Sequence, residues 1–192
     1  MKKFVVFSVI FIVASALGGF ANDEITYELG KEVKGLKLKD LNGKEFDLDN
    51  VLKNDEVKGV VFVFISYTCP GSISNDSRYI QHTKNFKKKG VLFVGISPNY
   101  NESEENMKKY AEKLGYNFPV LKDHDNIIAD RFAALTTPHA FLIGKDSKLL
   151  YSGRIDDSNR DPEKVKDATL ANAVDEYLAG KELSVTRTRP GG

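Results

Sequence analysis

The stretch GVVFVFISYTCP, from Gly59 to Pro70, decides the fold class of this chain. Its first eight residues form an unbroken β-branched and aromatic run of strand length, which is typical of a strand covered by helices on both faces. Pro70 suits the first turn of a helix, because proline loses no intrahelical hydrogen bond there. We therefore expect a buried strand that passes directly into a helix, with Cys69 at the helix N-cap.

The chain beyond Pro70 continues this alternation of strands and helices. No helix breaker follows it for several turns, so a single helix is expected over residues 70–88. A second buried strand is expected at 91–97, and the next helix is expected to begin with Asn101 and Glu104 as a capping pair. The remaining expected elements are a short strand at 118–121, a brief helix at 126–134, strands at 140–144 and 149–152, and a last helix that opens at Asp161-Pro162 and closes at Gly180.

A hairpin is expected before the first buried strand. The stretch LKLKDLNGKEFDL, from Leu36 to Leu48, alternates apolar and polar residues around Asn42-Gly43, which is the strongest short hairpin signal. Strands that alternate with helices, and then end in a hairpin and a helix, are typical of an α/β sandwich whose central strands are parallel. The sequence therefore predicts one α/β domain.

The N-terminal segment is typical of a secretory signal peptide. Lys2 and Lys3 precede an apolar run that ends at Leu17, and small residues lead to a cleavage point after Ala21. The run is shorter than a bilayer-spanning helix requires, and an uncleaved anchor remains the alternative. We expect an exported protein, periplasmic or extracellular, without stable membrane insertion once the signal is cleaved. The expected organisation is a signal peptide over 1–21, a folded domain over 22–184 and a flexible tail over 185–192.

The composition excludes several classes of protein. The 192 residues are 41% hydrophobic, and 28 basic side chains balance 27 acidic ones to a net charge of +1. Charges of both signs are interspersed, so the basic surface that a nucleic acid requires is absent and no nucleic-acid partner is expected. The one cysteine in the sequence excludes a disulfide framework within the chain.

Cys69 is the main candidate for chemistry. Buried parallel strands deliver functional residues at their C-terminal ends, and the start of the following helix favours a thiolate there. The alternative is a small buried cysteine that only packs. Ser72 is a candidate hydrogen-bond donor to the thiolate, and Thr68 and Tyr67 line the same loop.

Several stretches resemble one family. VFVFISYTCPGS, GISPNYNES, FPVLKD, TTPHAFLI and YSGRIDD are similar to the peroxiredoxin-like branch of the thioredoxin-fold superfamily, the alkyl hydroperoxide reductase and thiol-specific antioxidant (redoxin) type. The resemblance covers roughly residues 36–178. It implies a thioredoxin-like three-layer sandwich, in which helices flank a central mixed sheet that includes the N-terminal hairpin. It also implies a cis peptide at Thr137-Pro138 beside the Cys69 sulfur, where the Thr137 backbone can pair with an extended substrate.

Two departures from the family pattern bear on the chemistry. Thioredoxins and their relatives use Cys-x-x-Cys, whereas this chain has Cys69-Pro70-Gly71-Ser72, so no second thiol stands beside the first. Peroxiredoxins carry Pro-x-x-x-Thr-x-x-Cys, and here Phe62 and Ser66 occupy the proline and threonine positions. Ser66 still offers a hydroxyl, but the missing proline argues against efficient peroxide reduction. The family resemblance and the lone cysteine nevertheless favour peroxide slightly over a disulfide as the substrate.

These features predict an exported, single-cysteine, thiol-dependent antioxidant or oxidoreductase. Its Cys69 thiolate would attack a peroxide or a protein disulfide, and an external thiol or thioredoxin-like protein would reduce the product. No cofactor and no metal are expected, because a copper site built on Cys69 and His139 needs further ligands. The predicted catalytic residues are Cys69, Ser72, Thr68 and Ser66, and the predicted substrate-binding residues are Thr137, Pro138 and Pro70.

Two questions remain open from the sequence. The first is which arginine, if any, assists Cys69, since Arg78, Arg131 and Arg154 are all candidates. The second is whether the chain is an enzyme at all. The alternative is a redox-inactive thioredoxin-fold binding module that recognises an extended partner segment near Pro138.

Overall fold

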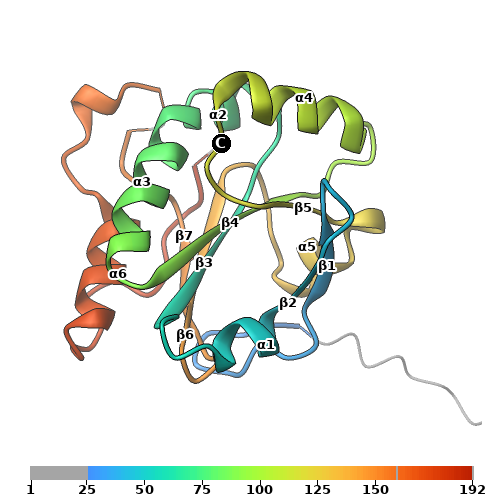
Figure 1. Cartoon of the computed structure of the whole chain (residues 1–192). Coiled ribbons are helices and arrows are strands. Elements are labelled where there is room, and N and C mark those ends of the chain that lie inside the picture. Colours follow the sequence, from blue (N-terminus) through green and yellow to red (C-terminus); the bar gives the residue numbers. More distant parts are fainter. Residues whose placement is uncertain (1–25, 159, 192) are drawn as a thin grey trace, which may run out of the picture.

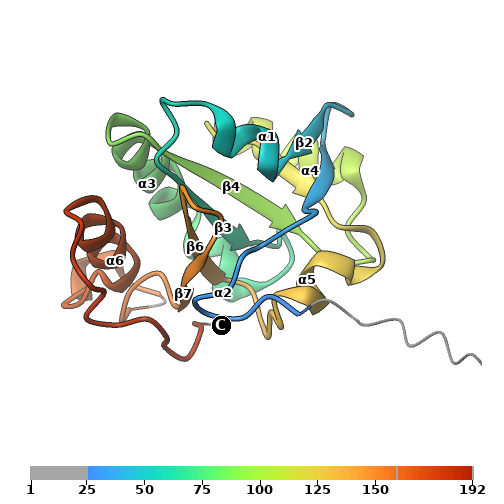
Figure 2. The ribbon, with the colours of Figure 1, turned by 90° about the horizontal axis from the view of Figure 1, so that it is seen from below.

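The computed structural model describes residues 26–158 and 160–191, so the expected signal peptide over residues 1–21 lies outside the described residues. A seven-stranded mixed sheet lies between two layers of helices (Figures 1 and 2). This arrangement confirms the predicted α/β sandwich. None of the helices in the described part of the chain is both long and apolar enough to cross a membrane.

The sheet has the strand order β2-β1-β5-β4-β3-β6-β7. Strands β3, β4 and β5 are parallel to one another and form the centre of the sheet. Strand β1 runs antiparallel to β5, and β6 runs antiparallel to β3. Parallel central strands and an N-terminal hairpin turning at Asn42-Gly43 are therefore confirmed. The strands are β1 Lys37–Asp40, β2 Glu45–Asp47, β3 Gly59–Phe64, β4 Val91–Ser97, β5 Val120–Lys122, β6 His139–Gly144 and β7 Leu149–Gly153.

Helices cover both faces of the sheet. Alternate residues of β3 enter different cores, with Phe62 in one cluster and Val61 and Val63 in the other, as expected for a strand buried on both faces. Helices α1 and α5 contribute to the Phe62 side, and α3, α4 and α6 to the opposite side. The helices are α1 Leu48–Lys53, α2 Pro70–Ile73, α3 Asp76–Lys88, α4 Glu104–Leu114, α5 Ile127–Arg131 and α6 Thr169–Leu178, and short 3₁₀ turns lie at His124–Asn126 and Pro162–Lys164.

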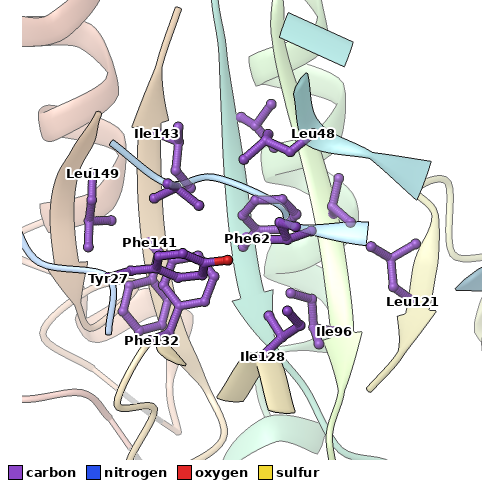
Figure 3. Close-up of a cluster of buried hydrophobic side chains, with 14 of the residues drawn as sticks. Tyr27, Leu48, Phe62, Ile96, Leu121, Ile128, Phe132, Phe141, Ile143 and Leu149 are labelled. Atoms are coloured by element: carbon purple, nitrogen blue, oxygen red, sulfur yellow. The ribbon is translucent and has the colours of Figure 1, made fainter. Parts of the chain in front are cut away.

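An aromatic cluster fills the core on the Phe62 side (Figure 3). The ring of Phe132 lies 4.8 Å from Tyr27, 4.6 Å from Phe141 and 6.0 Å from Phe62, measured between centroids. Phe132 directly follows α5, so its burial anchors the segment that leads to Thr137. Such rings contribute both buried area and edge-to-face contacts.

The prediction of a single helix over residues 70–88 is wrong, because this segment forms two helices, α2 and α3. The side chains of Ser74 and Asn75 both donate to the carbonyl oxygen of Gly71. The Asn75 N–H donates instead to Ser72 O, one residue short of the α-helical partner. Short polar side chains compete in this way with the backbone for its own acceptors.

Two helix starts also differ from the prediction. The N-cap of α4 is Ser103, whose Oγ accepts from Asn106 N, and the expected pair of Asn101 and Glu104 does not cap it. After Asp161-Pro162 the chain makes only a 3₁₀ turn, and α6 begins at Thr169. The expected closing glycine of that helix does adopt a left-handed backbone at Gly180.

The C-terminal segment has specific contacts, although no pattern in its sequence predicts order. Arg187 forms a parallel bridge beside Ser152 of β7, and Thr188 Oγ1 accepts from Arg154 N at 2.9 Å. Figures 1 and 2 both show the last residues that the structure describes close to α2. Part of the segment expected as a flexible tail over 185–192 thus pairs with β7, because the edge of this strand offers unpaired backbone groups to any neighbouring strand.

Candidate functional site

Cys69 lies where β3 leads into α2. It is the N-cap of α2, Pro70 is the first helical residue, and the cysteine is half-buried. Its Sγ donates a hydrogen bond to Thr137 O at 3.2 Å, and the Thr137–Pro138 peptide is cis. Both expectations drawn from the family resemblance, the cis peptide and its place beside the sulfur, are confirmed. The hydrogen bond is made by the protonated thiol, so the sulfur exchanges this contact for another when it ionises.

The helix that follows Cys69 is much shorter than expected. Since α2 has only four residues, one turn of backbone N–H groups faces the sulfur rather than a long helix. The helix-dipole effect expected from the sequence is therefore confined to one turn.

Three polar side chains join the Cys69 loop to the loop that follows β4. Ser66 Oγ and Thr68 Oγ1 both donate to Glu102 Oε1, at 2.5 and 2.8 Å. The backbone N–H of Thr68 reaches the same oxygen at 3.1 Å. Ser66 Oγ in turn accepts from the N–H of Cys69 at 2.9 Å. The predicted residues Ser66 and Thr68 thus lie in one hydrogen-bonded group that ends at the cysteine.

The hydroxyl of Ser72 is directed elsewhere. Ser72 is fully buried, and its Oγ accepts from Ser66 N at 2.9 Å and lies 3.2 Å from Tyr79 Oη. These contacts stabilise the start of the loop and the packing of α3. The expected hydrogen bond between this hydroxyl and the sulfur of Cys69 is not among the contacts of the described residues.

The candidate arginines are engaged away from the cysteine. Arg78 forms a buried ion pair with Asp156 at 2.7 Å, and Arg154 pairs with Asp167 at 2.8 Å. Arg131 lies 3.5 Å from the hydroxyl of Tyr27. Their contacts therefore support the scaffold, and the hydrogen bonds found at the Cys69 sulfur in the described residues include no guanidinium.

His139, which follows the cis proline, is a buried scaffold residue. Its Nδ1 accepts from Leu135 N at 3.3 Å, and its Nε2 lies 3.0 Å from Ser152 Oγ. Burial, and then the charge of Arg187, lower the pKa of His139 to about 4, so the ring is neutral near pH 7. Within residues 26–158 and 160–191, no three His, Cys, Asp or Glu side chains are arranged to hold a metal ion.

A pocket opens beside the Thr137 bend. Its volume is about 320 Å³, and it is lined by Asn99 of the loop after β4 and by Leu135, Thr136 and Thr137 among others. A larger pocket of about 490 Å³ lies between the β1–β2 hairpin and α1, and none of the predicted site residues lines it. Of the predicted site residues, Thr137 lines the smaller pocket, and Cys69 is not among its lining residues.

Glu102 is the residue of this site that the sequence analysis missed. It lies between Asn101 and Glu104, the expected capping pair, yet it is only 1% exposed. One signal was available, because β3 and β4 are adjacent parallel strands and the loops at their C-terminal ends meet at one edge of the sheet. Polar residues in the second loop were therefore candidates for contact with Ser66 and Thr68.

The mixed sheet, and the thiol set against the Thr137–Pro138 bend, define a thioredoxin-fold, thiol-dependent oxidoreductase. The comparisons with known proteins are more specific. This chain belongs to the AhpC/TSA family, whose model matches residues 29–152.

Individual relatives agree with this assignment. The thiol-disulfide oxidoreductase ResA of Bacillus cereus is 24% identical over 175 residues, which cover 88% of this chain and 91% of the relative. The crystal structure of an uncharacterized conserved protein from Geobacillus kaustophilus has a TM-score of 0.76 at 31% identity, over 87% of this chain and 90% of that one. The peroxidoxin BcpB of Mycobacterium tuberculosis shares the fold, with a TM-score of 0.60 at 22% identity over 80% and 97% of the two chains.

Proposed function

We propose that this protein catalyses thiol-disulfide exchange through Cys69, with an external thiol as reductant. The observation that carries the proposal is the position of the sulfur, which is half-buried at the end of a buried parallel strand and lies 3.2 Å from Thr137 O. Cys69 is thus partly open to solvent, and it closely follows the fully buried core strand β3. The similarity to thiol-disulfide oxidoreductases supports the same chemistry.

The proposed reaction has two displacement steps. The Cys69 thiolate attacks one sulfur of a substrate disulfide, forms a mixed disulfide and releases the other sulfur as a thiolate, which takes a proton from solvent. An external thiolate then attacks the substrate sulfur of the mixed disulfide and releases the Cys69 thiolate. Because Ser72 stands where a Cys-x-x-Cys motif has its second cysteine, no thiol within the motif performs this second step.

Disulfide sulfur is favoured over peroxide oxygen as the target. Peroxide cleavage develops negative charge on the leaving oxygen, which a nearby cation would stabilise. Arg78, Arg131 and Arg154 all make other contacts, as described above. A thiolate leaving group needs less such help, because thiols are far stronger acids than alcohols or water.

A protein is the expected source of the substrate disulfide. Three large apolar side chains are exposed on segments that adjoin the site: Ile73 on α2 at 41%, Tyr100 in the loop before Glu102 at 93%, and Leu135 just before Thr137 at 79%. Exposed apolar side chains of this size favour contact with a partner surface over contact with a small polar thiol.

The test compares the purified protein with Cys69→Ser in the reduction of insulin disulfides by dithiothreitol. We expect the wild type to accelerate reduction, the variant to lose the acceleration by at least about 100-fold, and acid-quenched intact mass to show a mixed disulfide at Cys69. A parallel assay follows hydrogen peroxide consumption with the same thiol, for which we expect a rate no greater than that of free thiol.

The other outcomes separate the alternatives. Fast peroxide consumption with a sulfenic acid at Cys69 would replace disulfide exchange by peroxidase chemistry. No acceleration of either reaction, and no covalent adduct at Cys69, would favour the redox-inactive module that binds an extended segment near Pro138. The variant is a fair control, because serine retains the size of the side chain and a hydrogen-bond donor for Thr137 O.

Export remains part of the proposal. The two lysines and the apolar run at the start of the sequence support a signal peptide that is cleaved after Ala21. The test is the intact mass and N-terminal sequence of the protein recovered from its native cell fractions. A mature N-terminus at Asn22 in an extracytoplasmic fraction is the expected result, and an uncleaved Met1 in a cytoplasmic fraction would contradict export.

A further inference from the structure

Glu102 is a buried acid with an unusually complete set of partners. Its side chain comes from the loop between β4 and α4 and is 1% exposed. Oε1 accepts from Ser66 Oγ at 2.5 Å, from Thr68 Oγ1 at 2.8 Å and from Thr68 N at 3.1 Å, and Oε2 accepts from Ser97 Oγ at 3.2 Å. A carboxylate so far from water is retained only when donors surround it, as they do here.

The hydrogen bonds continue from Glu102 to the backbone of Cys69. Ser66 Oγ has one proton and two lone pairs. The proton goes to Glu102, and the lone pairs accept the N–H groups of Thr68 at 3.1 Å and Cys69 at 2.9 Å. The carboxylate thus fixes the direction in which the serine hydroxyl donates. Without it, the proton is free to turn toward Thr68 Oγ1, which lies 3.2 Å away.

A buried lysine fixes the loop that carries Glu102. Lys122 Nζ donates to Asn99 O at 2.6 Å and to Ser97 O at 3.3 Å, which lie on either side of Pro98 at the end of β4. Burial lowers the pKa of Lys122, and the charge of Glu102 acts in the opposite direction. Charge-assisted hydrogen bonds from Lys122 to the carbonyl groups of Ser97 and Asn99 therefore hold the start of this loop in place. The Glu102 carboxylate thus extends toward Cys69 from a backbone that is itself fixed.

We propose that Glu102 is the positioning residue of the thiol site, acting through Ser66 and Thr68 to fix the backbone of Cys69 so that its sulfur faces Thr137. This inference rests on the proposed exchange reaction and adds a residue to it. Glu102 does not touch the sulfur in this assignment. Its effect is on the geometry from which Cys69 attacks, and a misplacement of about 1 Å is enough to cost about 100-fold in rate.

The first test is Glu102→Ala, which removes the acceptors of four hydrogen bonds. We expect kcat/KM for insulin disulfide reduction to fall about 10- to 100-fold. Alkylation of Cys69 by iodoacetamide, measured at a pH where the thiol is fully ionised, should fall less than about threefold, because a small reagent reacts with an accessible thiolate without requiring the Thr137 geometry. A purely structural defect would not separate the two rates in this way.

Conservative and control variants complete the design. Glu102→Gln retains an oxygen acceptor for the Ser66 and Thr68 groups and should recover most of the exchange rate. Glu104→Ala removes an acid of the same type from the exposed start of α4, and its exchange rate should stay within about twofold of the wild type.

The outcomes are distinguishable from failure of the proposed function. If the wild type exchanges disulfides no faster than Cys69→Ser, the reaction itself is wrong, whatever Glu102 does. If the wild type is active and a folded Glu102→Ala reacts within twofold of it, the positioning role is overturned. Should Glu102→Ala not fold, Ser66→Ala interrupts the same path at its second member, and an unchanged exchange rate in that variant would likewise overturn the proposal.

Discussion

The Ser72 hydroxyl is buried between polar groups from two separate segments of the chain. Its oxygen accepts from Ser66 N, just after β3, and lies 3.2 Å from Tyr79 Oη on α3. The residue is fully buried, so water does not reach the hydroxyl. A buried polar group that loses its partner costs more than a hydrogen bond contributes when it is made. The Ser72 hydroxyl therefore stabilises the fold, whereas the sequence suggested that it donates a hydrogen bond to the Cys69 thiolate.

Ser72→Ala is expected to lower the free energy of unfolding by about 1–3 kcal/mol, because Ser66 N and Tyr79 Oη would be left without this partner inside the core. Urea denaturation of the purified protein measures the change. Ser77→Ala on the exposed side of α3 is the matched control and should change it by less than about 0.5 kcal/mol. An effect no larger at position 72 than at position 77 would show that the enclosure of Ser72 has been misjudged.

His139 makes folding stability depend on pH. The folded pKa of about 4 lies below the ordinary 6.5, so between these values the unfolded chain binds more protons than the folded one. The stabilisation is complete above about pH 6.5 and is lost as the pH falls toward 4. Its size is at most about 3 kcal/mol. His82, whose pKa burial also lowers to about 4, contributes with the same sign.

His139→Asn should remove one of these two contributions, while the amide oxygen stays within reach of Leu135 N. We expect the variant to be less stable at pH 7, since the ring packs 4.2 Å from Phe141, and to lose less further stability between pH 6.5 and pH 4 than the wild type. Denaturant midpoints at several pH values provide the comparison. An undiminished slope would assign the pH dependence to other groups.

Among the elements, the division between α2 and α3 sets the surroundings of Cys69. The cause is that the Gly71 carbonyl accepts hydrogen bonds from the side chains of Ser74 and Asn75. It therefore does not accept the backbone N–H that a continuous helix would bring to it. Nothing in the local pattern forbids a longer helix, and the sequence therefore predicts one. The choice between the two depends on packing at Asn75, which is only 1% exposed.

The C-terminal segment packs so closely against the edge of β7 that there is no room for a side chain at position 153. An added Cβ would lie 2.0 Å from Thr188 Oγ1 and 2.9 Å from Thr188 N. Gly153→Ala is therefore expected to displace residues 186–188 from β7. Amide exchange should accelerate at Ser152 and Thr188, whose N–H groups bond across this contact. Unchanged protection at both amides would contradict the observed pairing.

Across the whole molecule, Phe132 links the core to the segment that carries Thr137. It packs against Tyr27, Phe62, Phe64 and Phe141, and it is 3% exposed. Phe132→Ala is expected to reduce the free energy of unfolding by about 3–5 kcal/mol, because both transfer energy and packing are lost. Tyr100→Ala, at a ring that is 93% exposed, is the control for loss of an aromatic side chain.

Denaturant unfolding distinguishes these two variants directly. Phe132→Ala should also lower disulfide exchange at concentrations of denaturant too small to unfold the wild type, since the Thr137 bend follows Phe132 by five residues. A change of less than about 1 kcal/mol would mean that the surrounding rings close the cavity almost completely.

The sequence by itself determined where the strands lie, which of them are buried on both faces, and that the cysteine follows a buried strand. Runs such as 59–66 and 91–97 carry their own signal, because a strand buried on both faces must be apolar at every position. The Asn42-Gly43 turn and the left-handed stop at Gly180 are equally local, since each depends on residues that tolerate a particular backbone conformation. Cys69 follows from these elements as the residue at a strand end.

The tertiary structure alone decided what surrounds that cysteine. Glu102 becomes buried only because the loops after β3 and β4 meet, and Ser72 faces Tyr79 only because α3 packs where it does. The bridge between Arg187 and Ser152 depends on the edge of β7 and not on a signal in the C-terminal sequence itself. These features depend on contacts between residues far apart in the chain, which periodicity and turn signals do not encode, because such signals report only the conformation of their own neighbourhood.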